Sequence, residues 1–147
     1  MFELLLLLHI LAATIWTGGH IVLTTVVLPK VLRERSPEQL LRFESGYEKI
    51  GIPSLIIQVV TGIALAHQQL GETGQWFDFE NPVSRLIFFK LLLLALTAAF
   101  AVDARLRLIP RLREENLVSL AWHVIPVTII SILFVIVGVS FRTGWFY

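Results

Sequence analysis

Four long apolar runs dominate the chain, at about residues 4–28, 51–68, 84–102 and 118–141, and the stretches between them carry most of the charged side chains. A helix needs about 20 mainly apolar residues to cross the hydrocarbon of a bilayer, and each run is close to that length. We therefore predict an all-α integral membrane protein, a four-helix up-down bundle in which residues 1–147 form a single transmembrane domain.

Residues that break helices set the predicted ends of these spans. Pro29 follows the first run, and Gly51 and Pro53 open the second. Residues 30–50 have the pattern of a short amphipathic helix, which we expect to lie on the membrane surface. Residues 103–116 connect the third span to the fourth.

The composition supports a membrane protein and narrows its chemistry. Hydrophobic residues make up 56% of the chain, charged residues make up 16%, and the mean hydropathy is +0.77, which excludes a soluble domain of this size. The chain has no cysteine and one methionine, Met1, so thiolate metal sites, iron–sulfur clusters and disulfides are excluded. Histidine remains as the strong nitrogen ligand, and the net charge of +1 gives no indication of nucleic-acid binding.

Basic residues gather on one side of the predicted bundle. We call the side that bears the N-terminus the terminal face and the opposite side the basic face; four spans return the C-terminus to the terminal face. The basic face receives Lys30, Arg33, Arg35, Arg42, Lys49, Arg105, Arg107, Arg111 and Arg113. The terminal face receives Arg85 and Arg142, and Lys90 lies inside the third span. The positive-inside rule therefore predicts a multi-pass protein of the bacterial inner (plasma) membrane with both termini on the periplasmic side.

The four histidines fall into two pairs by depth. His9 lies early in the first span and His67 ends the second, so both are expected near the terminal face. His20 lies about 16 Å deeper than His9, and His123 lies early in the fourth span, so both are expected nearer the basic face. Eleven residues are close to three helical turns, so His9 and His20 share one face of the first helix.

Two histidines on facing helices suit a b-type haem, whose iron takes one nitrogen from each side of the ring. We therefore expect two haems b per chain, one held by His9 and His67 and one by His20 and His123. This predicts a di-haem b-type cytochrome that carries electrons across or within the membrane. Its partners beside the lipid bilayer would be a quinone, a redox protein or a small oxidant, and the pattern leaves oxidoreductase activity and a homo-oligomer open.

Three other residues bear on the expected cofactor. Gly18 and Gly19 precede His20 and would let a flat macrocycle approach the helix backbone. Lys90 is an ionisable residue within the third span, where its ammonium either reaches the head groups or pairs with a haem propionate or an acidic substrate.

Trp76 lies in the loop between the second and third spans, which we expect to form a lid or docking surface on the terminal face.

The first span, "LHILAATIWTGGHIVL" (8–23), resembles that of the copper resistance protein D (CopD) family and of the related four-helix bacterial protoporphyrinogen oxidases. The matching positions are His9, Trp16, Gly18 and, in the third span, Lys90. The resemblance to CopD implies copper entry or handling. The resemblance to the oxidases implies a haem-dependent enzyme in which His9 and Lys90 hold a porphyrinogen.

The sequence therefore leaves three classes of function open: a di-haem electron carrier, a copper-handling protein and a porphyrinogen oxidase. The chain departs from the resembling families because it has no cysteine or internal methionine to relay copper, and because His20, His67 and His123 exceed the oxidase pattern. These departures favour the di-haem carrier over the other two.

Overall fold

In the computed structural model, which describes residues 1–146, each apolar run lies within one long helical rod. The first rod comprises α1 (Phe2–Val22), the π-helical turn η1 (Leu23–Val27) and α2 (Leu28–Glu34), and the second is α3 (Pro37–Leu70). The 3₁₀ turn η2 (Thr73–Phe77) leads to the third rod, formed by α4 (Pro82–Asp103), η3 (Ala104–Leu108) and η4 (Ile109–Arg111). The short turn η5 (Glu114–Asn116) opens the fourth, α5 (Leu117–Thr143). All four rods are long and apolar enough to cross a membrane, which confirms the predicted fold class.

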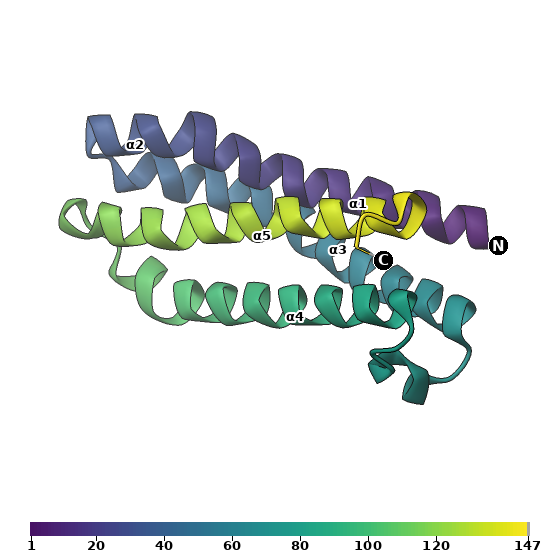
Figure 1. Ribbon diagram of the computed structural model, residues 1–147. Helices are drawn as coiled ribbons and strands as arrows, with labels where there is room; N and C mark the ends of the chain where they lie inside the picture. The colour runs from purple at the N-terminus through teal and green to yellow at the C-terminus, as the bar shows by residue number, and fades with distance from the viewer. Residues whose placement is uncertain (147) are drawn as a thin grey trace.

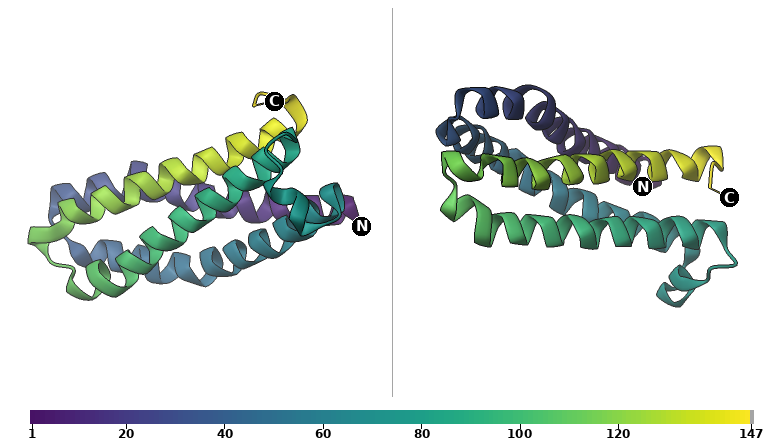
Figure 2. Two further views of the ribbon diagram at one scale, coloured as in Figure 1. Left: turned by 60° about the horizontal axis from the view of Figure 1, so that its bottom comes forward. Right: turned by 60° about the vertical axis from the view of Figure 1, so that its left-hand side comes forward.

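The rods run alternately up and down, with both ends of the chain and η2 at one end of the molecule (Figure 1). α1 packs along α3 and α5, and α4 packs along α5, so the first span neighbours the second and the fourth. By contrast, the described residues of α3 and α4 make few close contacts with each other. Two further views show the same rods from other directions (Figure 2).

The predicted start of the second span is wrong, because α3 is one continuous helix and includes most of residues 30–50. Gly51 and Pro53 lie in its interior. Proline removes one backbone donor from the helix, but α1 packs along α3 on both sides of the proline, where Tyr47 contacts Trp16 and Thr61 contacts His9. The amphipathic segment is therefore the polar end of a spanning helix and no separate surface helix.

Pro29 does not end the first rod either. It is the second residue of α2, which directly follows the π-helical turn η1. The wider π turn shifts the hydrogen-bond register ahead of the proline, so the missing donor is absorbed without a break. The first rod ends at Arg35, which has a left-handed conformation with φ 50° and ψ 39°.

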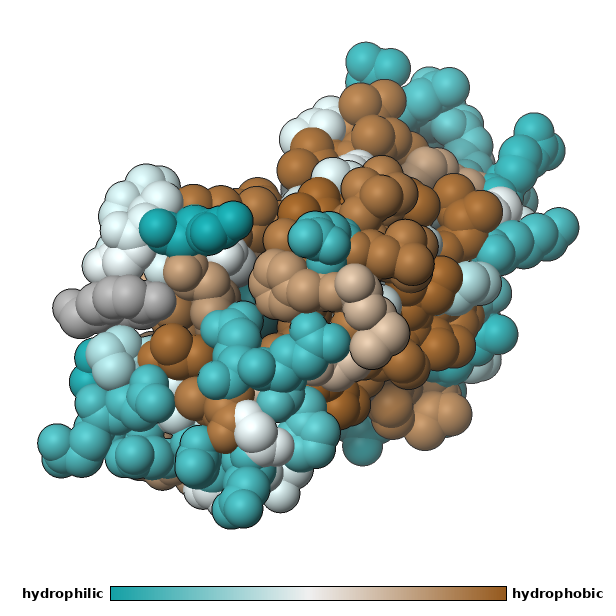
Figure 3. All heavy atoms as spheres, turned by 90° about the vertical axis from the view of Figure 1, so that its right-hand side faces the viewer, coloured by the Kyte–Doolittle hydropathy of each residue, from teal (hydrophilic) through white to brown (hydrophobic). Residues whose placement is uncertain are grey.

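Large apolar side chains cover the outside of the rods, as a lipid bilayer requires. Ile56, Val60 and Ile129 are each more than half exposed (58%, 61% and 54%). Figure 3 looks at the terminal face: hydrophobic residues fill much of the view, and hydrophilic ones gather at the bottom, where Figure 1 places the α3–α4 connection. The first two rods have 33 and 34 residues, so at about 1.5 Å per residue they exceed the ~30 Å hydrocarbon core.

Hydroxyl side chains join α1 and η1 to α5 inside this apolar bundle. Thr17 Oγ1 donates to the carbonyl of Ser131 at 3.2 Å, and the hydroxyls of Thr24 and Thr128 lie 2.5 Å apart. Ser131 is fully buried. Small hydroxyl residues let two helices approach closely while their polar atoms stay paired, so they fix α1 against α5.

A tyrosine and a glycine fix α1 against α3. The ring of Tyr47 occupies the space where a Cβ on Gly19 would stand, and its hydroxyl donates to the carbonyls of Trp16 at 2.9 Å and Ile15 at 3.3 Å. A Cβ on Gly18, by contrast, would have nothing within 4 Å. Of the two adjacent glycines, Gly19 is the one that the helix contact requires.

We predict that Gly19→Ala lowers the unfolding temperature of the detergent-purified protein, whereas Gly18→Ala leaves it unchanged or raises it. The Gly19 methyl would displace the Tyr47 ring at a typical overpacking cost of about 1–3 kcal/mol. Alanine at position 18 meets no neighbour and improves helix propensity by up to ~1 kcal/mol. Equal effects of the two substitutions would contradict the packing role assigned to Tyr47.

Candidate functional site: two cavities between the helices

A cavity of about 520 Å³ lies between α3 and α4 toward the basic face, and α1 and α5 also contribute to its wall. We call it the basic-side cavity. The ionisable or aromatic side chains that line it include Trp16, His20, Glu44, Tyr47, Glu48, Phe100, Arg105 and His123. It exists because α3 and α4 do not pack along each other.

His20 is buried in the wall of this cavity, with 9% of its surface exposed. Its Nδ1 lies 2.9 Å from the carbonyl oxygen of Trp16, and because a carbonyl only accepts, Nδ1 carries the proton and donates. The Trp16 ring packs against the imidazole at 4.4 Å, and Tyr47 meets it edge-on at 5.8 Å. Nε2 of the neutral ring therefore carries a lone pair, and none of residues 1–146 forms a hydrogen bond with it.

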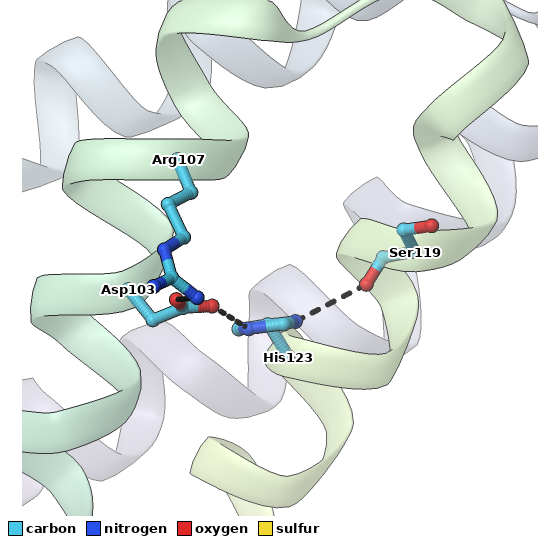
Figure 4. Close-up of polar contacts among 4 residues, drawn as sticks. All are labelled: Asp103, Arg107, Ser119 and His123. Carbon is cyan, nitrogen blue, oxygen red and sulfur yellow. Dashed lines mark hydrogen bonds and ion pairs between the residues drawn. The ribbon is translucent and has the colours of Figure 1, made fainter.

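His123 stands in a different electrostatic setting on the same cavity (Figure 4). Its Nε2 lies 2.7 Å from Oδ2 of Asp103, and its Nδ1 lies 3.2 Å from the carbonyl of Ser119. Arg107 Nη1 in turn lies 3.2 Å from Oδ1 of Asp103. Both ring nitrogens thus lie beside acceptor oxygens, and the shorter contact places the Nε2 proton in a hydrogen bond to Asp103. His123 offers a lone pair only after Nε2 loses its proton and Asp103 moves aside.

Carboxylates and an unpaired donor complete this cavity. Glu44 and Glu48 of α3 line it, and Glu48 accepts a hydrogen bond from Arg105 at 2.5 Å across the α3–α4 opening. The Nε1–H of Trp16 is buried and has no hydrogen-bond partner among the described residues. The cavity therefore offers imidazole nitrogens and carboxylate oxygens as metal ligands. It also holds the indole N–H of Trp16, which has no hydrogen-bond partner among the described residues. Within residues 1–146, no three His, Asp or Glu side chains are grouped closely enough to hold a metal ion together.

The second cavity, about 300 Å³, lies toward the terminal face, and we call it the terminal-side cavity. His9, Gly62, Trp76, Lys90, Gly138 and Arg142 are among its lining residues. His9 Nδ1 lies 3.0 Å from Thr61 Oγ1, whose own proton goes to the carbonyl of Ile57 at 2.6 Å. His9 therefore donates from Nδ1, and its Nε2 carries the lone pair.

Lys90 turns toward α5 within the bundle. Its ammonium lies 5.6 Å from the centre of the Phe141 ring, and a Cβ on Gly138 would lie 3.4 Å from Nζ. Gly138 thus leaves room for the ammonium. No described carboxylate forms an ion pair with Lys90.

His67 is exposed at the end of α3 and meets the ring of Trp76 edge-on at 6.2 Å. It is not among the described residues that line either cavity. The structure therefore brings His20 and His123 to one cavity, and it brings His9 and Lys90 to another. It does not bring His9 and His67 to a common cavity.

Two residues that shape these sites were missed from sequence. Tyr47, which contacts His20 edge-on, falls within the predicted surface helix because Pro53 predicts a helix start after it. Thr61, which fixes the tautomer of His9, is an unremarkable threonine next to Gly62. The role of Thr61 depends on the packing of α1 on α3, which no local sequence pattern indicates.

These features define a four-span membrane protein with two interior cavities, each presenting an oriented imidazole. A family model described as Copper resistance protein D (CopD) matches residues 41–141, which is more than half of the chain, so the protein belongs to the CopD family. His67, Lys90 and His123 lie within the matched region, and His9 and His20 precede it. No curated protein and no solved structure matches the chain.

Proposed function

We propose that this CopD-family protein handles copper ions within the membrane and that the basic-side cavity receives the ion. The family supports copper as cargo. The observation that best supports the proposal is the lone pair of His20 Nε2, because His20 and His123 line the same cavity. Imidazole nitrogens with carboxylate oxygens suit Cu²⁺, whereas Cu⁺ prefers sulfur ligands, which this chain lacks apart from Met1.

The state of His123 makes such binding exchangeable. Copper at His123 Nε2 must displace the proton that is shared with Asp103, so binding of the metal releases a proton and weakens at acidic pH. Glu44 lines the same cavity and attracts a cation toward it, while the charge of Glu48 is paired with Arg105. His20 is available as a ligand at once, whereas His123 must first be released from Asp103. Such a site suits an exchangeable copper ion better than a permanent metal centre.

We expect the detergent-purified protein to bind about one Cu²⁺ per chain, and His20→Ala to lower the affinity by roughly tenfold or more, because an oriented ligand is lost. Equilibrium dialysis against Cu²⁺, followed by metal analysis of the protein, measures both. His67→Ala is the matched control, since His67 lines neither cavity, and it should bind copper as the unmodified protein does. Equal copper affinity in the His20→Ala variant would contradict the proposal.

Haem is the second candidate, and one observation favours it. The basic-side cavity, at about 520 Å³, falls within the usual range of ligand and cofactor sites, and Trp16 leaves a buried donor there for an acceptor group. The lining residues are compatible with one haem, which His20 and, once released from Asp103, His123 would hold. A bound haem would supply one-electron redox chemistry. An absorption spectrum of the purified protein distinguishes the two candidates, since stoichiometric haem gives an intense Soret band and copper bound to imidazole does not.

We also propose that both termini face the outside of a bacterial inner membrane. The proposal rests on nine lysines and arginines between the first and second spans and between the third and fourth. The chain contains no cysteine, so single cysteines can report its orientation.

We predict that Thr73→Cys, in η2, reacts with a membrane-impermeant maleimide in intact cells, whereas Glu115→Cys, in η5, reacts only after the membrane is permeabilised. Both positions are exposed, so accessibility from each side of the membrane decides the result. The reverse pattern would overturn the proposed orientation.

A further inference from the structure

We infer that the terminal-side cavity binds the anionic head group of a small membrane-soluble amphiphile, with Lys90 as its counter-ion. The inference concerns a different cavity from the copper proposal and does not depend on it. It rests on the charge, the unpaired donor and the size of the cavity.

The ammonium of Lys90 gives the terminal-side cavity a positive charge within a membrane span. Lys90 lies eight residues inside α4, about 12 Å from its start, and its side chain is half-buried. Its described charge contact is with the face of the Phe141 ring, and no described carboxylate pairs with it. A cation inside a membrane span is costly without an opposite charge, so the site calls for an anion.

The indole of Trp76 is an independent second observation. Trp76 lines the same cavity with 9% of its surface exposed, and its Nε1–H is buried without a hydrogen-bond partner among the described residues. A buried donor of this kind requires an acceptor. Arg142, in the last turn of α5, adds a second positive charge to the lining. An ammonium, a guanidinium and an unpaired N–H are all groups that bind the oxygens of a carboxylate or phosphate, and all three residues line this cavity.

The rest of the lining determines what carries that head group. Phe2, Leu6, Ile63, Leu65, Ile87 and Leu91 supply apolar walls from α1, α3 and α4. A volume of about 300 Å³ is at the lower limit of ligand sites, which favours a single-chain amphiphile over a large ring. The head group would therefore lie at Lys90 and Trp76, with the apolar chain along these walls.

Native mass spectrometry of the detergent-purified protein, titrated with dodecanoate, dodecyl phosphate and dodecanol, tests the inference. We expect at least one of the two anions to bind at least tenfold more tightly than the neutral alcohol, since charge-assisted hydrogen bonds are lost with dodecanol. Preference for dodecanoate would indicate a single-chain carboxylic acid as the natural ligand, and preference for dodecyl phosphate would indicate a single-chain phosphate ester. Equal binding of dodecanol would overturn the inference.

Variants locate the binding site. Lys90→Met should weaken binding of the anion at least tenfold, and Lys90→Arg should retain it. Trp76→Phe removes the five-membered ring of the indole with its N–H group, and should weaken binding several-fold. Lys49→Met, on the basic-face end of α3, is the matched lysine control and should bind normally. Copper binding and the unfolding temperature of each variant report whether the bundle is intact. Retained anion binding in a folded Lys90→Met protein would contradict the assignment.

Discussion

The separation of α3 from α4 is the constraint on which both sites depend. Tyr47 against Gly19 holds α1 to α3, and the hydroxyls of Thr17, Thr24 and Thr128 hold α1 and η1 to α5. α4 packs along α5 alone. Two cavities consequently lie between the separated helices, and α1 forms part of the wall of each. Because His9 and His20 are about three turns apart on α1, one helix supplies an imidazole to both cavities.

The partner of each imidazole determines what the imidazole can do. Backbone or hydroxyl acceptors hold the Nδ1 protons of His20 and His9, which leaves Nε2 with a lone pair. Asp103 instead holds His123 in a form that donates. The surroundings differ in charge as well: Glu44 and the Glu48–Arg105 ion pair line the basic-side cavity, whereas Lys90 and Arg142 line the terminal-side cavity. One suits a cation and the other an anion.

The spans, their up-down order and the depth of each histidine could be predicted from sequence because lipid imposes length and hydropathy on every spanning helix. Helix ends were less predictable: Pro29 and Pro53 break isolated helices, but a π turn and interhelical packing accommodate them here. The pairing of His9 with His67 was inferred from depth alone. Depth does not specify on which side of α3 a residue lies, and His67 faces outward beside Trp76.

We propose His20 as the oriented ligand of a copper site between separated helices. Electron paramagnetic resonance of the protein loaded with a substoichiometric amount of Cu²⁺ reports the ligand atoms of the bound ion. We expect nitrogen couplings from imidazole that are reduced in His20→Ala and unchanged in His67→Ala. Nitrogen couplings that persist unaltered in His20→Ala, or a spectrum with oxygen ligands alone, would contradict it.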